Sequence, residues 1–345
     1  MSVGDLKSKR GVLLVNLGTP DAPTPRAVRR YLDEFLSDPR IIDIPFLARQ
    51  LLLRLFILPF RPKKSAAAYA TIWTAEGSPL LTYSRSLVAK VQGLLGEGTP
   101  VELGMRYGNP SIASALTRLE ERGATEIVCL PLYPQYSSAS TGSSVDKVMK
   151  EIAPLWNIPA VRFEGAFYNA PWFLDCFADV ARPQLAAFAP DFVVLSYHGL
   201  PERHMNKSDR TGGSHCLTSS ACCDRIVDAN AFCYRAQCFA TTRGLAERLG
   251  FAPGTYETTF QSRLGRTPWI RPYTDVFLPE LAKKGAKRVA VLCPAFVADC
   301  LETIEEIGER ARADWKALGG EELMLVSSLN DDARWAQAVA QVVSR

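Results

Sequence analysis

A histidine and a row of glutamates carry the clearest chemical signal in this sequence of 345 residues. His198 follows the apolar run 192–195, which predicts a buried parallel strand with the imidazole at its carboxyl end. Glu302, Glu306 and Glu309 recur at i, i+4 and i+7 after a second such strand, on one face of a predicted helix. An imidazole that faces carboxylates can hold a divalent cation or accept protons. A histidine bonded to its own loop and a solvated acidic helix face are the alternatives.

A second cluster consists of cysteines. Five of the nine fall in one short irregular segment: Cys216, Cys222, Cys223, Cys233 and Cys238. In a chain without an export signal, thiols suit metal ligation better than disulfides. Four thiolates suit zinc or an iron–sulfur cluster, and the lack of paired C-x2-C knuckles disfavours zinc. The spacing predicts a metal site and leaves open both the metal and which of the five cysteines is spare.

The remaining candidates lie on loops at predicted strand ends. They are Tyr107, Tyr133, Tyr136, Gln261, Ser262 and Trp269. Ligands of open α/β sheets bind at the carboxyl ends of the strands, where large aromatic side chains can sandwich a flat molecule. Ordinary loop packing is the alternative for each of them.

Strands and helices alternate along the chain, as is typical of parallel sheets built from right-handed crossovers. The pattern restarts near residue 170, which predicts an α/β fold of two similar Rossmann-like domains, their parallel sheets flanked by helices, with a cleft between them. We expect domains at 1–170 and 171–345, with the last helix packing back on the first domain. One continuous helix is expected over 299–318. No Gly-x-Gly-x-x-Gly follows a strand, which argues against a dinucleotide site.

The overall composition narrows the class of protein. A formal net charge of +4 gives no sign of a nucleic-acid partner. The N-terminus lacks an apolar signal core, and no apolar run reaches the roughly 20 residues of a membrane span, so we expect a cytoplasmic protein. The exception is the apolar segment 44–60, followed by Arg-Pro-Lys-Lys. Such a segment can lie at the inner face of a membrane or line an apolar mouth, and a buried core helix is the alternative.

Several motifs, in this order along nearly the whole chain, resemble the ferrochelatases, which insert ferrous iron into a porphyrin at the end of haem synthesis. The motifs are the segments 14–20, 133–137 with 141–144, 196–201, 261–263 with 268–269, and 294–302. The resemblance implies a chelatase-like fold and a lyase that inserts Fe2+ into protoporphyrin IX, releasing two protons and giving protohaem. It makes His198 and Glu302 the pair that handles the substrate metal, with Glu306 extending the acidic path.

The same resemblance places Tyr107 and Trp269 near the macrocycle and makes the segment at about 44–62 an active-site lip. The cysteine-rich insertion at about 205–240 departs from many members of the family, some of which carry a [2Fe–2S] cluster. We therefore expect such a cluster on four of the five cysteines. Insertion of metal into coproporphyrin or another tetrapyrrole is the alternative activity. A tetrapyrrole carrier or iron sensor is the alternative outside enzymes.

Overall fold

The computed structural model describes residues 9–265 and 267–345. Contacts divide the chain into two compact units. The first comprises the described residues up to 132 together with 139–165 and 331–345, and the second comprises 133–138 and 166–330. Each unit is built around one sheet of four parallel strands.

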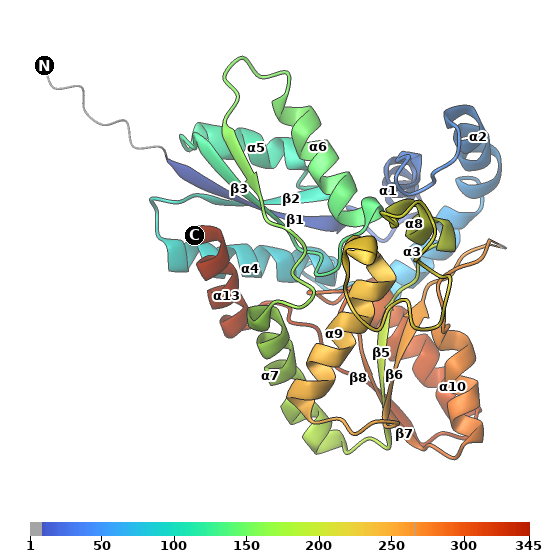
Figure 1. The fold of residues 1–345 in the computed structure, drawn as a ribbon. Coiled ribbons are helices and arrows are strands. Elements are labelled where there is room, and N and C mark those ends of the chain that lie inside the picture. The colour runs from blue at the N-terminus through green and yellow to red at the C-terminus, as the bar shows by residue number, and fades with distance from the viewer. Residues whose placement is uncertain (1–8, 266) are drawn as a thin grey trace, which may run out of the picture. The chain divides into compact units, whose positions relative to one another are not determined.

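The sheet of the first unit has the strand order β2-β1-β3-β4. Its strands are β1 (Arg10–Thr19), β2 (Val101–Gly108), β3 (Glu126–Pro131) and β4 (Ala160–Phe163). Its helices are α1 (Pro25–Ser37), α2 (Phe46–Leu51), the π-helix η1 (Leu52–Ile57), α3 (Arg61–Ile72), α4 (Pro79–Leu95), α5 (Ile112–Glu121), α6 (Ser143–Ile152) and α13 (Ala333–Ser344). The short π-helix η2 (Ser138–Gly142) leads into α6. Figure 1 shows α5 and α6 on one side of this sheet and α4 on the other, with α13 beside α4.

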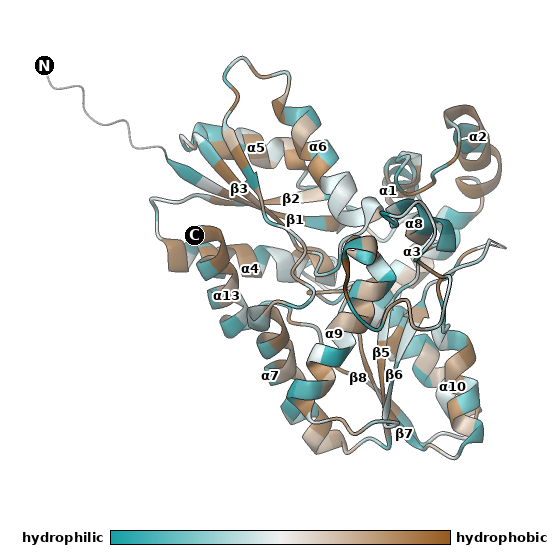
Figure 2. Cartoon of the chain, in the orientation of Figure 1, coloured by the Kyte–Doolittle hydropathy of each residue, from teal (hydrophilic) through white to brown (hydrophobic). Residues whose placement is uncertain are grey.

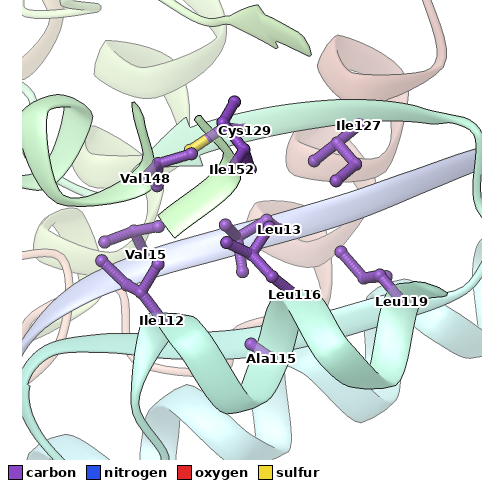
Figure 3. Packing of buried hydrophobic residues seen from close by; sticks show 10 residues of the cluster. All are labelled: Leu13, Val15, Ile112, Ala115, Leu116, Leu119, Ile127, Cys129, Val148 and Ile152. Atoms are coloured by element: carbon purple, nitrogen blue, oxygen red, sulfur yellow. The ribbon is translucent and has the colours of Figure 1, made fainter. Parts of the chain in front are cut away.

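Helices on both faces explain why β1 is apolar without alternation. The side chains of Leu13 and Val15 pack among Ile112, Leu116 and other residues of α5 and α6 (Figure 3). Val12 and Leu14 point to the other face and are equally buried. A strand covered on both sides is a continuous apolar run, which is the pattern that predicts it from sequence.

The second unit repeats the arrangement with the strand order β6-β5-β7-β8. Its strands are β5 (Phe192–His198), β6 (Tyr256–Gln261), β7 (Arg288–Leu292) and β8 (Glu322–Leu325). Its helices are α7 (Pro171–Phe188), α8 (Glu202–Ser208), the 3-10 turn η3 (Asp228–Asn230), α9 (Tyr234–Leu249), α10 (Thr274–Lys283), α11 (Leu301–Thr303), the π-helix η4 (Ile304–Ala311) and α12 (Arg312–Ala317). Two parallel sheets with the same strand order confirm the predicted fold class of two similar α/β halves.

One face of this second sheet carries the core that supports η4. Val194 and Val291 of the sheet pack with Leu278 of α10, Ile307 of η4 and Trp315 of α12. Trp315 is fully buried, and its indole N–H donates to the carbonyl oxygen of Lys287 at 3.0 Å. The π-helix is therefore held on its inner side by apolar packing.

The prediction of one continuous helix over 299–318 is wrong in one respect. The segment is helical, but it consists of α11, the π-helix η4 and α12. A π-helix bonds i to i+5 and turns more widely than an α-helix, so residues spaced for one α-helical face no longer share it. Glu302 and Glu306 are half-buried, whereas Glu309 is exposed.

The apolar segment 44–60 is not a buried core helix. It forms α2 and η1, and large apolar side chains on it are exposed (Figure 2). Within the described residues, no helix is both long enough and apolar enough to cross a bilayer.

Candidate active site

Three neighbouring strands of the second unit end at the same edge of their sheet. β5 lies between β6 and β7, and all three run parallel. Their carboxyl ends lead into His198, Ser262 and the loop that precedes Glu302 of α11. Residues far apart in sequence are brought to one edge because parallel strands must all end on the same side.

The hydrogen bond of His198 determines which of its ring nitrogens is available. Its Nδ1 lies 2.6 Å from the carbonyl oxygen of Gly199. A carbonyl oxygen can only accept, so Nδ1 carries the hydrogen and the neutral ring keeps a lone pair on Nε2. The rings of Trp269 and Phe296 both have their centroids 6.4 Å from that of His198. The imidazole is thus held by one polar contact and two aromatic neighbours, with its basic nitrogen free for chemistry.

Glu306 is the acidic residue whose ionisation is most affected by its surroundings. Burial raises the pKa of Glu306, and the negative charge of Glu302 adds to the rise. Hydrogen bonding from Ser262, electrostatic attraction to His198 when its ring is protonated, and attraction to Arg310 offset part of it. A carboxyl group with a raised pKa can take up and release protons nearer neutral pH.

Ser262 holds the carboxylate of Glu306 with two hydrogen bonds. Its backbone N–H donates to Oε1 at 2.9 Å and its hydroxyl donates to Oε2 at 2.5 Å. Ser262 has a φ of 64°, in the left-handed region that costs a non-glycine residue about 1 kcal/mol. The two bonds to one carboxylate stabilise this strained conformation. Ser262, predicted as a substrate contact, is thus engaged with the acidic residue.

Gln261 braces the start of the acidic helix. Its Nε2 donates to the backbone oxygen of Glu302 at 2.6 Å, and its Oε1 accepts from the hydroxyl of Ser196 at 2.7 Å. Only 3% of Gln261 is exposed. Both ends of its amide are used inside the protein, and the expectation that Gln261 contacts substrate stays a prediction.

A clasp that sequence reasoning missed holds the loop before Glu302. The carboxylate of Asp299 accepts from the side chains of Thr303 at 2.9 Å and Asn330 at 2.7 Å. The side-chain oxygen of Asn330 in turn accepts from the backbone N–H of Asp299 at 2.8 Å. Cys300 lies within this loop, and its buried thiol is hydrogen-bonded to Glu302. In the sequence, the nearness of Asp299 to the predicted row of glutamates was the one sign of this clasp.

Trp269 lies beside His198, as described above, and is 9% exposed. Its indole Nε1 is buried and has no hydrogen-bond partner among the described residues. The backbone around Trp269 is fixed, because Trp269 forms an isolated β-bridge with Pro201 and the backbone N–H of Ile270 donates to the carbonyl oxygen of Leu200. An unsatisfied buried donor next to the imidazole is a feature that a bound ligand would explain.

Tyr107 belongs to the first unit and is fully buried. Its hydroxyl donates to Asp38 at 2.8 Å, and Arg106 and Ser143 bond the same carboxylate oxygen. Burial alone would raise the pKa of Asp38, but these hydrogen bonds, with one from the backbone of Arg40 and the charge of Arg106, lower it. The hydroxyl of Tyr107 is thus used in this internal network, and its expected place near the macrocycle stays a prediction.

Tyr133 and Tyr136 belong to the second unit and are both half-buried. The backbone N–H of Tyr136 donates to the side chain of Gln237 at 2.7 Å, and its ring packs edge-on against Phe232 at 5.3 Å. Tyr136 therefore contacts the start of α9, next to the cysteine-rich segment.

The five cysteines of the insertion are all buried, each at most 5% exposed. The Sγ atoms of Cys222 and Cys223 are 3.6 Å apart, and the Cys233 thiol is near enough to those of Cys216 and Cys223 to shift the pKa of each. Cys238 is instead hydrogen-bonded to Tyr234. Burial raises the pKa of Cys216 to about 11. Four thiols thus form one connected group and the fifth has a different partner.

No group of three or more His, Cys, Asp or Glu side chains in the described part of the chain is already arranged to hold a metal ion. This applies to the histidine–glutamate edge and to the thiols alike. Neither set is a preformed metal cage in this structure.

Comparisons with known proteins agree with this architecture. The solved structure of the sirohydrochlorin chelatase SirB from Bacillus subtilis subspecies spizizenii in complex with cobalt matches with a TM-score of 0.52 at 10% identity, over 97% of this chain and 94% of that chain. SirB from Bacillus subtilis with Fe3+ matches with a TM-score of 0.51 at 12% identity and the same coverage. These likenesses define the fold as that of the two-domain chelatases.

The sequence identifies the family within that class. The Ferrochelatase family model matches residues 9–345. A ferrochelatase of Coxiella burnetii is 46% identical over 98% of this chain and 94% of its own length. One of Legionella pneumophila is 48% identical over 97% of this chain and 99% of its own length. The chain belongs to the ferrochelatase family, the ferro-lyases that insert iron into a porphyrin in haem synthesis.

Proposed function

We propose that this enzyme inserts Fe2+ into protoporphyrin IX at the edge of the sheet where His198 and Glu302 emerge. The observation that carries the proposal is the tautomer of His198, whose Nε2 lone pair is left free by the bond from Nδ1 to Gly199. Insertion requires removal of two pyrrole protons and delivery of a cation that has lost part of its water. A neutral imidazole can accept one proton and pass it on before it accepts the second, and carboxylates suit a divalent ion.

Glu306 is proposed to carry protons away from this site. Its raised pKa and its position one turn beyond Glu302 suit it to exchange protons, while the two bonds from Ser262 keep it in place. Glu302 is held through its backbone by Gln261 and is proposed to meet the metal with His198. Trp269 offers its unsatisfied indole N–H and ring edge to the bound macrocycle.

The apolar segment of the first unit, which we call the lip (residues 44–62), is proposed to receive an apolar porphyrin such as protoporphyrin in preference to more highly charged tetrapyrroles. Its exposed large apolar side chains are Phe46, Leu47, Leu51, Leu55, Phe56 and Phe60, each at least 52% exposed. Coproporphyrin and sirohydrochlorin carry additional carboxylates, which an apolar surface would bind less well.

The test is anaerobic incubation of the purified enzyme with Fe2+ and either protoporphyrin IX or coproporphyrin III, following the haem absorption bands. We expect protoporphyrin to be converted with the higher kcat/KM. Faster turnover of coproporphyrin would overturn the substrate assignment but not the reaction. Binding of porphyrin with no metallation of either substrate would instead favour a carrier.

We also propose a [2Fe–2S] cluster on Cys216, Cys222, Cys223 and Cys233, with Cys238 as the spare thiol. The four are supported by their burial and their pairwise contacts. Cys233 also caps α9, a helix of 16 residues whose N-terminus favours negative charge. When bound, the cluster supplies a one-electron redox centre and four covalent ties across the loop. The simplest role for these ties is structural.

The lip is proposed to touch the membrane surface as well. Exposed Lys63 and Lys64 follow its apolar side chains, a combination that suits an interface with anionic lipids. This peripheral contact would place the enzyme at the membrane, into which an apolar porphyrin partitions.

We expect the double variant Phe56→Gln/Phe60→Gln to bind anionic vesicles at least tenfold more weakly than the parent, because each buried Phe contributes about 1.5–3 kcal/mol. Co-sedimentation with phosphatidylglycerol-containing vesicles measures this. Trp156→Gln is the matched control, because Trp156 is 98% exposed in the same unit but lies outside the lip. Equal loss of binding in the control and the double variant would contradict a specific membrane face.

A further inference from the structure

One arginine contacts the group of four thiols directly. The Nη1 of Arg235 donates to the Sγ of Cys223 at 3.1 Å. Its Nε donates to the carbonyl oxygen of Arg271 at 3.2 Å, and its guanidinium lies over the ring of Phe239, with 4.6 Å between the guanidinium carbon and the ring centroid. Three contacts in different directions hold the guanidinium where it is. The positive charge of Arg235 is therefore held next to a sulfur atom, because the guanidinium is not free to swing out into solvent.

Two other charged side chains near the thiols, those of Arg243 and Asp209, bond to backbone groups. Arg243 donates to the carbonyl oxygen of Cys223 at 3.1 Å. The carboxylate of Asp209 accepts from the backbone N–H groups of His215 and Cys216 at 2.9 and 2.7 Å, which fixes the start of the loop. Of these two arginines, Arg235 donates to a cysteine sulfur and Arg243 to a backbone oxygen.

We propose that Arg235 sets the reduction potential of the cluster, an inference that rests on the cluster proposed above. Adding one electron to a cluster of this type increases the negative charge on its ligand sulfurs. A fixed guanidinium bonded to one of those sulfurs stabilises the reduced form more than the oxidised form. Hydrogen bonds from outside the ligand set are a general means of tuning a metal centre. Arg235 thus raises the potential and makes the cluster easier to reduce.

The same side chain joins the cysteine loop to the segment beside His198. Arg271, whose carbonyl oxygen Arg235 binds, lies two residues after Trp269. This bond, made through Nε, orients the guanidinium together with the bond from Nη1 to the sulfur. A lysine at this position has a single ammonium and cannot make both contacts in the same fork geometry.

The experiment is a redox titration of anaerobically purified full-length protein with dithionite and mediators, following the visible absorption and the electron paramagnetic resonance of the reduced cluster. We expect Arg235→Gln to lower the ratio of reduced to oxidised cluster about tenfold at a given ambient potential, which is 59 mV for a one-electron couple. Arg235→Lys should fall between this variant and the parent. Arg243→Gln is the matched control, since its bond reaches only the backbone of Cys223, and it should shift the potential clearly less.

An unchanged potential in Arg235→Gln, or equal shifts in Arg235→Gln and Arg243→Gln, would overturn the proposal while leaving the cluster itself in place. Loss of the cluster in both Arg235 variants would make the arginine a structural support and would also reject tuning. Parent protein without iron or the characteristic absorption would overturn this proposal and the cluster together. Titrating the parent first therefore separates the two failures.

Discussion

Replacing His198 with alanine is expected to slow iron insertion by about a hundred- to ten-thousandfold, the usual contribution of a positioned acid–base group. The physical reason is the loss of the Nε2 lone pair, which the bond from Nδ1 to Gly199 leaves available in the parent. Initial rates of haem formation under anaerobic conditions measure the effect. Porphyrin binding, followed by fluorescence quenching, should change only a few-fold, since the aromatic neighbours Trp269 and Phe296 remain.

A chemical rescue serves as the control for this variant. Imidazole added to the alanine variant should restore part of the rate, because a free base can enter the space that the side chain leaves. Rescue would show that the fold is intact and that the ring itself is needed. Full turnover by the unrescued variant would contradict the role assigned to His198.

Serine substitutions in the insertion should have an all-or-none effect on the cluster. We expect Cys216→Ser, Cys222→Ser, Cys223→Ser and Cys233→Ser each to lose most of the bound iron, because an uncharged hydroxyl is a poor ligand for iron–sulfur clusters. Cys238→Ser should keep it, because the thiol of Cys238 is hydrogen-bonded to Tyr234. Iron and sulfide analysis with visible absorption of anaerobic preparations measures this.

Cys238 is the matched control for those four positions, since it is equally buried and belongs to the same segment. Loss of iron in Cys238→Ser, with full retention in one of the other four variants, would show that the ligand set is different. Two irons per chain in every variant would contradict cysteine ligation altogether. The parent is expected to hold two irons per chain.

The strands of this protein were predictable because parallel strands buried on both faces are continuous apolar runs. The run 192–195 predicted β5, and the restart of the pattern predicted a second sheet. β4, α3 and α8 were not predicted, since β4 is only four residues long and the helices are short or rich in lysine and arginine. Such segments depend on neighbours for their conformation more than on their own pattern.

The glutamates at 302, 306 and 309 show where a prediction from local residue spacing fails. An i, i+4, i+7 spacing assumes 3.6 residues per turn, and η4 does not follow it. Ile307 and Trp315 of this segment pack in the core under the sheet, a tertiary contact that the residue spacing does not show. The same holds for Tyr107, whose position at a strand end was readable but whose side chain turns inward to Asp38.

By itself, the sequence determined the alternating architecture, the family, and the positions of His198 and Glu302 after buried strands, because these depend on burial periodicity and on short contiguous motifs. Only the tertiary structure decided that Nε2 is the free nitrogen of His198, that Ser262 holds Glu306, and that Arg235 faces a cysteine sulfur. Each of these is a contact between specific atoms, most of them between residues distant along the chain. Such contacts depend on how the loops at the end of the sheet pack against one another. No local pattern of residue types encodes that packing.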